Sequence, residues 1–226
     1  MTPNEFRTIN ASDAGGDMTA AYGMWLKRGI DIFGASVCFL LSFPVFAMTV
    51  FCILLIDGRP LFFGHRRIGR YGRPFKCWKF RTMVVDAERQ LDAYLQTHPN
   101  AQEEWTRTRK LRADPRITRS GYFLRRTHLD ELPQLWNVLV GEMSLVGPRP
   151  VTEYEIVEHY RSFADQVTSV RPGVTGSWQI TPRRNDIDYD LRVALDVEYI
   201  ASQTVLRDVL ILIKTIPILL KRSEGR

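Results

Sequence analysis

Two neighbouring carboxylates, Asp130 and Glu131, stand just before a proline in the stretch RRTHLDELPQLWNVL (125–139). A proline is tolerated in the first turn of a helix, so Pro133 predicts an amphipathic helix that begins near Asp130. A carboxylate in that place is most often a helix cap. A helix N-terminus also stabilises an ionised carboxylate and attracts phosphate, so the pair suits phosphate chemistry as well.

The two carboxylates are expected to take separate roles, because successive residues on a helix point about 100° apart. One carboxylate would attack phosphorus, while the other would hold a divalent metal ion. An anionic nucleophile needs nearby cations that neutralise the phosphate it attacks. The candidates are Lys79, Arg81, Arg125, Arg149, Arg171, Arg183 and Arg184.

The net charge of +6 is concentrated between Gly58 and Val85, where eight Lys or Arg and no Asp or Glu occur. Such a segment suits an anionic partner, namely a phosphorylated substrate, an acidic membrane surface or a nucleic acid, and a solvated basic face is the structural alternative. Its aromatic residues keep a nucleic-acid-binding module as a second hypothesis, which salt-sensitive binding to any DNA or RNA would favour. The segment has no Walker loop and no GxGxxG, so phosphate binding would fall to arginines, lysines and helix N-termini.

Cysteine and histidine spacing argues against a disulfide framework and a zinc site. The three cysteines form no CxxC, which suits a protein that faces the cytoplasm. The four histidines show neither HxxxH nor HExxH spacing.

Residues 32–56 form a run of 25 residues without a charge. As a straight helix this run would be roughly 37 Å long, more than the ~30 Å hydrocarbon core of a bilayer. Pro44 near its centre removes one backbone hydrogen bond and kinks the helix, and Ser42 lies close enough to bond a freed carbonyl. Basic residues flank both ends, which places both ends in the cytoplasm by the positive-inside tendency. Residues 25–57 are therefore either a re-entrant hairpin or a kinked ordinary span.

The remainder of the chain is predicted to form a tail and one domain. Residues 1–24 are polar and predict a disordered tail without a signal peptide. Within 58–226 the pattern predicts a β-hairpin around Gly69–Gly72 and one or two surface helices within 84–112. The C-terminal run VLRDVLILIKTIPILLKR (205–222) predicts an amphipathic helix, either at the membrane interface or in the core. The expected fold class is α+β, with a membrane hairpin and a small, mainly helical cytoplasmic catalytic domain.

Five ordered stretches carry a resemblance to a known family. They are KFRTM (79–83), DPRIT (114–118), LRRTHLDELPQLWNVLVGEMSLVGPRP (124–150), RPGVTG (171–176) and WQI with RND (178–186). Together they resemble the bacterial sugar transferases, also called monotopic phosphoglycosyl or polyprenyl-phosphate hexose-1-phosphate transferases. The likeness runs from about Lys27 to Lys221 and is similar to the short galactosyl-phosphate transferases of exopolysaccharide synthesis.

The resemblance implies the reaction and its location. The family transfers a hexose-1-phosphate from a UDP-sugar to undecaprenyl phosphate with Mg²⁺, releases UMP, and works by a ping-pong mechanism through an aspartyl intermediate. It acts at the cytoplasmic face of the bacterial inner membrane, among membrane lipid, and downstream glycosyltransferases extend the product; no nucleic acid takes part. The family's membrane anchor is a re-entrant helix-break-helix, which favours the hairpin for residues 25–57. An inactive assembly scaffold remains as an alternative, against which the intact Asp130–Glu131 pair argues.

The resemblance also assigns roles to individual residues. By match to the family's Asp-Glu pair, Asp130 would be the nucleophile and Glu131 a Mg²⁺ ligand. Lys79 and Arg125 match positions that orient the nucleophile and the phosphates. The remaining matches imply substrate binding by Arg81, Arg149, Arg171, Arg184 and Asn185, and a membrane break at Ser42 and Pro44.

Three positions depart from the family pattern. The usual Ser-Pro of the membrane break reads Ser42-Phe43-Pro44, so the serine is displaced by one residue. The position two before Asp130, commonly serine, is His128, either a packing or capping variant or a proton carrier. The loop TPRRN (181–185) is one residue longer than the usual SGRN, which puts its contacts to the nucleotide or sugar in question.

Overall fold

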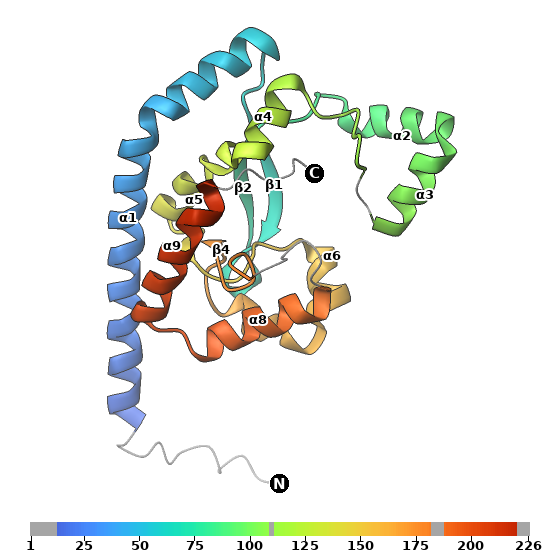
Figure 1. Ribbon diagram of the computed structural model, residues 1–226. Helices are drawn as coiled ribbons and strands as arrows, with labels where there is room; N and C mark the ends of the chain where they lie inside the picture. The colour runs from blue at the N-terminus through green and yellow to red at the C-terminus, as the bar shows by residue number, and fades with distance from the viewer. Residues whose placement is uncertain (1–12, 109–110, 182–187, 221–226) are drawn as a thin grey trace.

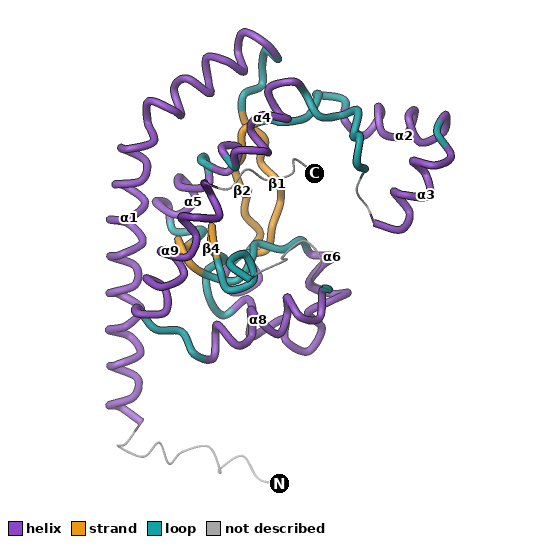
Figure 2. Tube along the Cα trace, viewed as in Figure 1, coloured by secondary structure: helices purple, strands orange, loops and turns teal. Residues whose placement is uncertain are grey.

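The computed structural model describes residues 13–108, 111–181 and 188–220. It is mostly helical, with two short two-stranded sheets, which agrees with the expected α+β class (Figure 2). The helices are α1 (Asp13–Ile56), α2 (Ala87–Thr97), α3 (Pro99–Thr108), α4 (Arg119–Thr127), α5 (Gln134–Val140), α6 (Glu153–Glu155), α7 (Ala164–Thr168), α8 (Tyr189–Ala201) and α9 (Val205–Leu220). The strands are β1 (Phe62–Ile68), β2 (Pro74–Phe80), β3 (Ser144–Val146) and β4 (Gly173–Thr175).

Helix α1 is a single helix of 44 residues that contains Pro44 and bends in its C-terminal half (Figure 1). The hairpin expected from the sequence is therefore not formed as two arms folded against each other. Ser42 donates to the carbonyl of Phe39 at 3.3 Å, and not to that of Leu40, the carbonyl that a proline at position 44 leaves without its helical donor. Residues 13–24, expected in a disordered tail, belong to the first turns of α1, and residues 1–12 lie outside the described residues.

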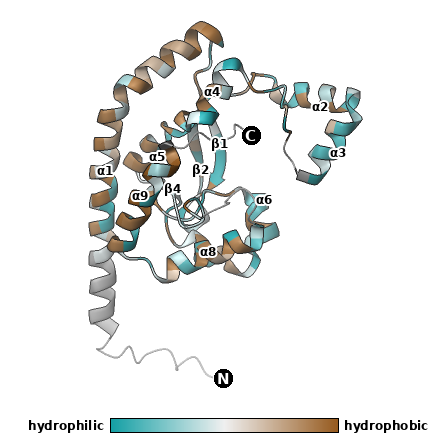
Figure 3. Cartoon of the chain, in the orientation of Figure 1, coloured by the Kyte–Doolittle hydropathy of each residue, from teal (hydrophilic) through white to brown (hydrophobic). Residues whose placement is uncertain are grey.

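The part of α1 from Gly23 to Ile56 is long and apolar enough to cross a membrane, and only 11% of its most apolar stretch is buried. Figure 3 shows hydrophobic residues along this helix and on the neighbouring α9. Such exposed apolar surface is compatible with a membrane location.

Helix α9 combines the two alternatives considered for the C-terminal run. One side packs into the protein, where Ile211 and Asp208 are buried. The other side exposes Leu206, Ile213 and Ile216 by more than half of their surface. The helix is thus partly core, and its exposed apolar face suits a membrane interface.

Strands β1 and β2 form the expected hairpin, joined by a tight turn at Arg70–Gly72. Gly72 has a φ of +71°, in the left-handed region that glycine adopts without strain. Phe62 pairs with Phe80, while Phe63 pairs with Lys79 one residue on. Because side chains alternate along a strand, the two phenylalanines of the first pair lie on one face of the hairpin and Phe63 and Lys79 on the other. The register therefore places Phe63 beside Lys79, the candidate lysine, and keeps the Phe62–Phe80 pair on the opposite face.

Two further contacts position the candidate site. Asn137 of α5 accepts from the Trp78 N–H at 3.0 Å and donates to the Lys76 carbonyl at 2.8 Å, which holds α5 against the edge of β2. The parallel pair β3–β4 brings Gly147 and Gly173 so close that a Cβ on either would overlap the backbone of the other. The glycines of VGPRP and RPGVTG are thus required by a close backbone approach.

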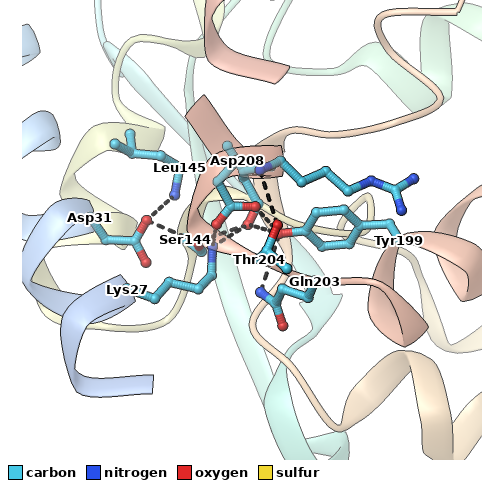
Figure 4. Close-up of polar contacts among 10 residues, drawn as sticks. Lys27, Asp31, Ser144, Leu145, Tyr199, Gln203, Thr204 and Asp208 are labelled. Atoms are coloured by element: carbon cyan, nitrogen blue, oxygen red, sulfur yellow. Dashed lines mark hydrogen bonds and ion pairs between the residues drawn. The ribbon is translucent and has the colours of Figure 1, made fainter. Parts of the chain in front are cut away.

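A buried polar network joins α1 to β3, α8 and α9 (Figure 4). The Lys27 ammonium bonds the Asp208 carboxylate at 2.5 Å and the Val146 carbonyl at 3.0 Å. The Tyr199 hydroxyl donates to the same carboxylate at 2.6 Å. One turn along α1, Asp31 accepts from the Ser144 hydroxyl at 2.9 Å. These contacts attach the apolar helix to the rest of the protein.

We expect Lys27→Met to lower the unfolding free energy by roughly 3 kcal/mol, because it leaves the buried Asp208 carboxylate without its cation. Thermal unfolding in detergent micelles measures the loss. The double variant Lys27→Met with Asp208→Leu removes both charges and should recover most of it. A Lys27→Met protein as stable as the wild type would contradict this role for the ion pair.

Candidate active site

Asp130 and Glu131 lie in a short 3₁₀ turn, Leu129–Glu131, between α4 and α5. His128 has a φ of +59° and ends α4, so the chain leaves the helical path just before the acidic pair. Helix α5 begins only at Gln134, with Pro133 in the N-cap position. The expectation that Asp130 caps this helix is therefore wrong, because the intervening turn separates the carboxylate from the helix N-terminus.

The Lys79 ammonium connects the two carboxylates. It is 2.5 Å from Glu131 Oε1 and 3.9 Å from Asp130 Oδ2. Lys79 comes from β2, and β2 packs against the turn that carries the acidic pair. Asp130 is 8% exposed, whereas Glu131 is half-buried. The three residues expected at the centre of the site thus lie together.

Arg125 lies one turn before Asp130 on α4, with its Nε donating to the Thr82 hydroxyl at 2.9 Å. Burial lowers the pKa of its guanidinium, and the Asp130 carboxylate is close enough to oppose that change. The Arg125 guanidinium is therefore a cation close to the buried Asp130 carboxylate.

The pKa values of the two carboxyl groups are shifted in opposite directions by their surroundings. Burial raises the pKa of Asp130 to about 6, and the Glu131 charge adds to this rise, while Lys79 and Arg125 oppose it. Burial alone would also raise the pKa of Glu131, but the charge and hydrogen bond of Lys79, followed by the charge of Arg149, lower it below its ordinary value. Glu131 is therefore an anion at neutral pH, whereas the pKa of Asp130 is raised toward neutrality.

Arg149, also expected in the site, belongs to the GPRP segment, which follows β3 where that strand pairs with β4. Its guanidinium stacks over the Trp178 ring at 5.2 Å. Arg149 is near enough to Glu131 to lower the pKa of that carboxyl. With Lys79 and Arg125, it is the third cation whose charge acts on the acidic pair.

Two of the arginines expected to bind substrate have other partners. Arg81 is 6% exposed and donates to the carbonyls of Asp57, Gly58 and Arg59, just beyond the C-terminus of α1. Arg171 donates to the Gly141 carbonyl at 2.7 Å, at the C-terminus of α5. Arg81 therefore bonds carbonyls of the segment that follows α1, and Arg171 bonds the carbonyl of the residue that caps α5. Both contacts stabilise the chain at the end of a helix. Arg183, Arg184 and Asn185 lie outside the described residues.

Sequence reasoning missed a second polar group beside the site. Arg67 of β1 forms an ion pair with Glu155 at 2.8 Å, and the Tyr189 hydroxyl donates to the other oxygen of Glu155 at 2.6 Å. Glu155 also completes a capping box with Thr152. Two sequence patterns could have indicated this group. The TxxE motif at 152–155 predicts a capping box. Strand alternation places Arg67 on the same face of the hairpin as Lys79.

The model of one protein family, described as bacterial sugar transferase, matches residues 22–222. The chain belongs to the bacterial sugar transferase family. Among its relatives, the exopolysaccharide production protein ExoY of Rhizobium meliloti (strain 1021) is 48% identical over 195 residues, which are 86% of this chain and 85% of ExoY. The UDP-galactose-lipid carrier transferase of Erwinia amylovora is 48% identical over 199 residues, 88% of this chain and 41% of the relative.

A third relative, the undecaprenyl-phosphate galactose phosphotransferase of Salmonella typhimurium (strain LT2), is 43% identical over 199 residues, 88% of this sugar transferase and 41% of the relative. The chain thus spans about two fifths of the Erwinia and Salmonella proteins and most of ExoY. The family match includes Asp130, Glu131, Lys79, Arg125 and Arg149, and so covers the whole site described above.

Two carboxylates of this sugar transferase could hold Mg²⁺. Within the described ranges, no group of three or more His, Cys, Asp or Glu side chains is arranged to hold a metal ion. Mg²⁺ at phosphate-binding sites needs only one or two carboxylates, because waters and the substrate's phosphates complete its coordination. The partly exposed Glu131 carboxylate therefore fits such an ion once a phosphorylated substrate is present.

Proposed function

We propose that this protein transfers hexose-1-phosphate from a UDP-sugar to undecaprenyl phosphate and thereby initiates a surface glycan such as exopolysaccharide. The observation that carries the proposal is the buried Asp130 carboxylate, which lies 3.9 Å from the Lys79 ammonium and next to Glu131, a carboxyl whose pKa is lowered. The printed names of the Erwinia and Salmonella relatives support the choice of donor and acceptor.

In the first step, an oxygen of ionised Asp130 attacks the phosphorus that carries the sugar. The bond between this phosphorus and the bridging oxygen breaks, and UMP leaves with the electron pair. Lys79, Arg125 and Arg149 neutralise the phosphates and the charge that develops on the leaving oxygen. The product is a phosphosugar bound to Asp130 as an acyl phosphate.

In the second step, a phosphate oxygen of undecaprenyl phosphate attacks the same phosphorus. The bond to Asp130 breaks, and the carboxylate returns to its original state. The lipid now carries a diphosphate-linked hexose. Both steps use anionic nucleophiles, so no proton has to move between the protein and the substrates.

Glu131 is the residue that we propose as the Mg²⁺ ligand, and the bound ion would supply charge neutralisation at the diphosphate. The Lys79 ammonium bonds Oε1 of the same carboxylate at 2.5 Å. Glu131 would therefore bind the metal ion and Lys79 together.

We further propose that α1 is a re-entrant anchor with both ends on the cytoplasmic side of the inner membrane, and that Ser42 and Pro44 form its break. Basic residues occur near both ends, with Arg28 before the apolar run and Arg59 after it. The bend in α1 and its exposed apolar surface support this arrangement (Figure 1).

The topology predicts that single cysteines placed before and after the apolar run are labelled from the same side. Met24→Cys and Arg59→Cys, each in a chain with its three natural cysteines replaced by serine, should react with a membrane-impermeant maleimide only after cell permeabilisation. An ordinary span would instead expose one of the two sites in intact spheroplasts.

A panel of UDP-sugars tests the proposed reaction, with undecaprenyl phosphate and Mg²⁺, scored by UMP release and by transfer of radiolabel to the lipid. Galactose is the favoured hexose, because two of the relatives are named for it, and glucose is the alternative. Absence of labelled lipid with every UDP-sugar would overturn the proposal.

A further inference from the structure

A surface pocket of about 390 Å³ opens at the edge of β1 that faces away from β2. It is lined by Phe63, His65, Thr152, Glu153 and Tyr154, among others. Its volume lies within the range of small-molecule sites, which is about 300–1,000 Å³. One wall comes from the strand and the other from the start of α6, and the backbone bond from Ile68 N–H to the Val151 carbonyl at 2.8 Å holds the two walls together.

The pocket lies next to the candidate active site, because one of its lining residues is the cross-strand partner of Lys79. Phe63 pairs with Lys79 across the hairpin, so the two side chains lie on the same face as near neighbours. His65 follows on this face, near enough to Lys79, Arg67 and Arg149 for their charges to act on its ring. Three cations therefore lie close to the side of the pocket that His65 forms, where the phosphates of a nucleotide need positive charge.

The walls of the pocket have the chemistry of a nucleoside site. Phe63 and Tyr154 are exposed by 54% and 71%, so both rings offer faces on which a base can stack. His65 Nδ1 is buried and makes no hydrogen bond to any residue in the described part of the chain. Burial, followed by the charge of Arg67, lowers the pKa of His65, so at pH 7 its ring is neutral and offers one donor and one acceptor. The Glu153 carboxylate at the rim can accept hydrogen bonds from ribose hydroxyls.

We propose that this pocket binds the nucleoside of the nucleotide-sugar donor, with the base against Phe63 and Tyr154 and the phosphates toward Lys79 and Arg149. The inference rests on the proposed function, since it assigns the distal half of the same donor. The pocket suits the nucleoside better than the hexose. The hexose is attached to the phosphorus that Asp130 attacks, so it must lie close to Asp130. The nucleoside is one phosphate further away. The pocket extends along β1 from Phe63, the cross-strand partner of Lys79, toward Ile68.

Binding of radiolabelled UMP, measured by equilibrium dialysis of the full chain in detergent micelles with Mg²⁺, tests the proposal. Phe63→Ala and Tyr154→Ala should each weaken UMP binding about tenfold, the scale of one base–aromatic stacking contact. The KM for the UDP-sugar should rise, while the KM for undecaprenyl phosphate should not change. Phe63→Leu, which keeps the apolar bulk but not the ring, should show a smaller loss.

Val157→Ala is the matched control, because Val157 is as exposed as Tyr154, at 71%, and does not line the pocket. Unchanged UMP affinity in both alanine variants would overturn the proposal, and so would an effect confined to the KM for undecaprenyl phosphate. If the wild type transfers no phosphosugar, the proposed function fails, but UMP affinity still decides whether the pocket holds a nucleoside. If the wild type is active and the variants bind UMP normally, only the pocket assignment fails.

Discussion

Replacing Asp130 by asparagine is expected to abolish formation of the phosphosugar–protein adduct and to lower turnover by at least about 10³-fold. An amide oxygen cannot attack phosphorus as a carboxylate does, and asparagine occupies nearly the same volume at this buried position. Denaturing gel analysis after incubation with a radiolabelled UDP-sugar detects the adduct. Asp92→Asn, an exposed substitution on α2, is the matched control and should remain active.

The same variant should be more stable than the wild type at alkaline pH. Asp130 has its pKa raised from 3.8 to about 6, so its ionisation disfavours the folded state as the pH rises through that range. The shift of about two units corresponds to a gain of up to ~3 kcal/mol for Asp130→Asn at pH 8, and the gain should vanish at pH 4. An active asparagine variant would remove Asp130 from the reaction. An inactive variant with lowered stability would mean that the loss reflects damage to the fold.

Lys79→Met is the second substitution with a large expected effect, a loss of about 10²- to 10³-fold in kcat/KM. The lysine lowers the pKa values of both Asp130 and Glu131, so its removal raises both. A protonated Asp130 is not a nucleophile, and activity in the wild type should therefore fall below about pH 6. In Lys79→Met the same decline should occur at higher pH.

The pH–rate profile separates this role from simple loss of phosphate binding. Lys76→Met is the control, because Lys76 lies on the opposite face of the same strand and is exposed over the Trp78 ring. It should leave both the rate and the profile unchanged. A Lys79→Met protein with reduced rate but the wild-type profile would show that the lysine binds phosphate without controlling ionisation of Asp130.

Much of the local structure follows from the sequence. The glycines around Arg70 and Tyr71 predicted the β-hairpin, since a tight turn needs a residue with positive φ, and Gly72 provides it. The apolar run predicted a membrane-compatible helix with a proline inside, which α1 has. These features depend on neighbours within a few residues, and the sequence displays such neighbours directly.

The roles of individual cations did not follow from the sequence. Arg81 stands two residues after Lys79, yet its guanidinium bonds carbonyls beyond the end of α1, whereas the Lys79 ammonium bonds Glu131. Strand alternation explains why side chains two apart share a face, but not which distant segment meets each one. The Pro133 register likewise suggested a cap at Asp130, but Asp130 lies in a separate 3₁₀ turn and Pro133 itself is the N-cap of α5.

The sequence by itself determined three things. It showed which residues can do phosphate chemistry, where the apolar helix lies, and to which family the chain belongs. Only the tertiary structure decided which cations lie close to Asp130, how deeply that carboxylate is buried, and that a pocket lies along β1 near the site. The physical reason is that burial and charge pairing depend on contacts between β2, the turn before α5 and the GPRP segment. These lie tens of residues apart in the chain, so only folding brings them together.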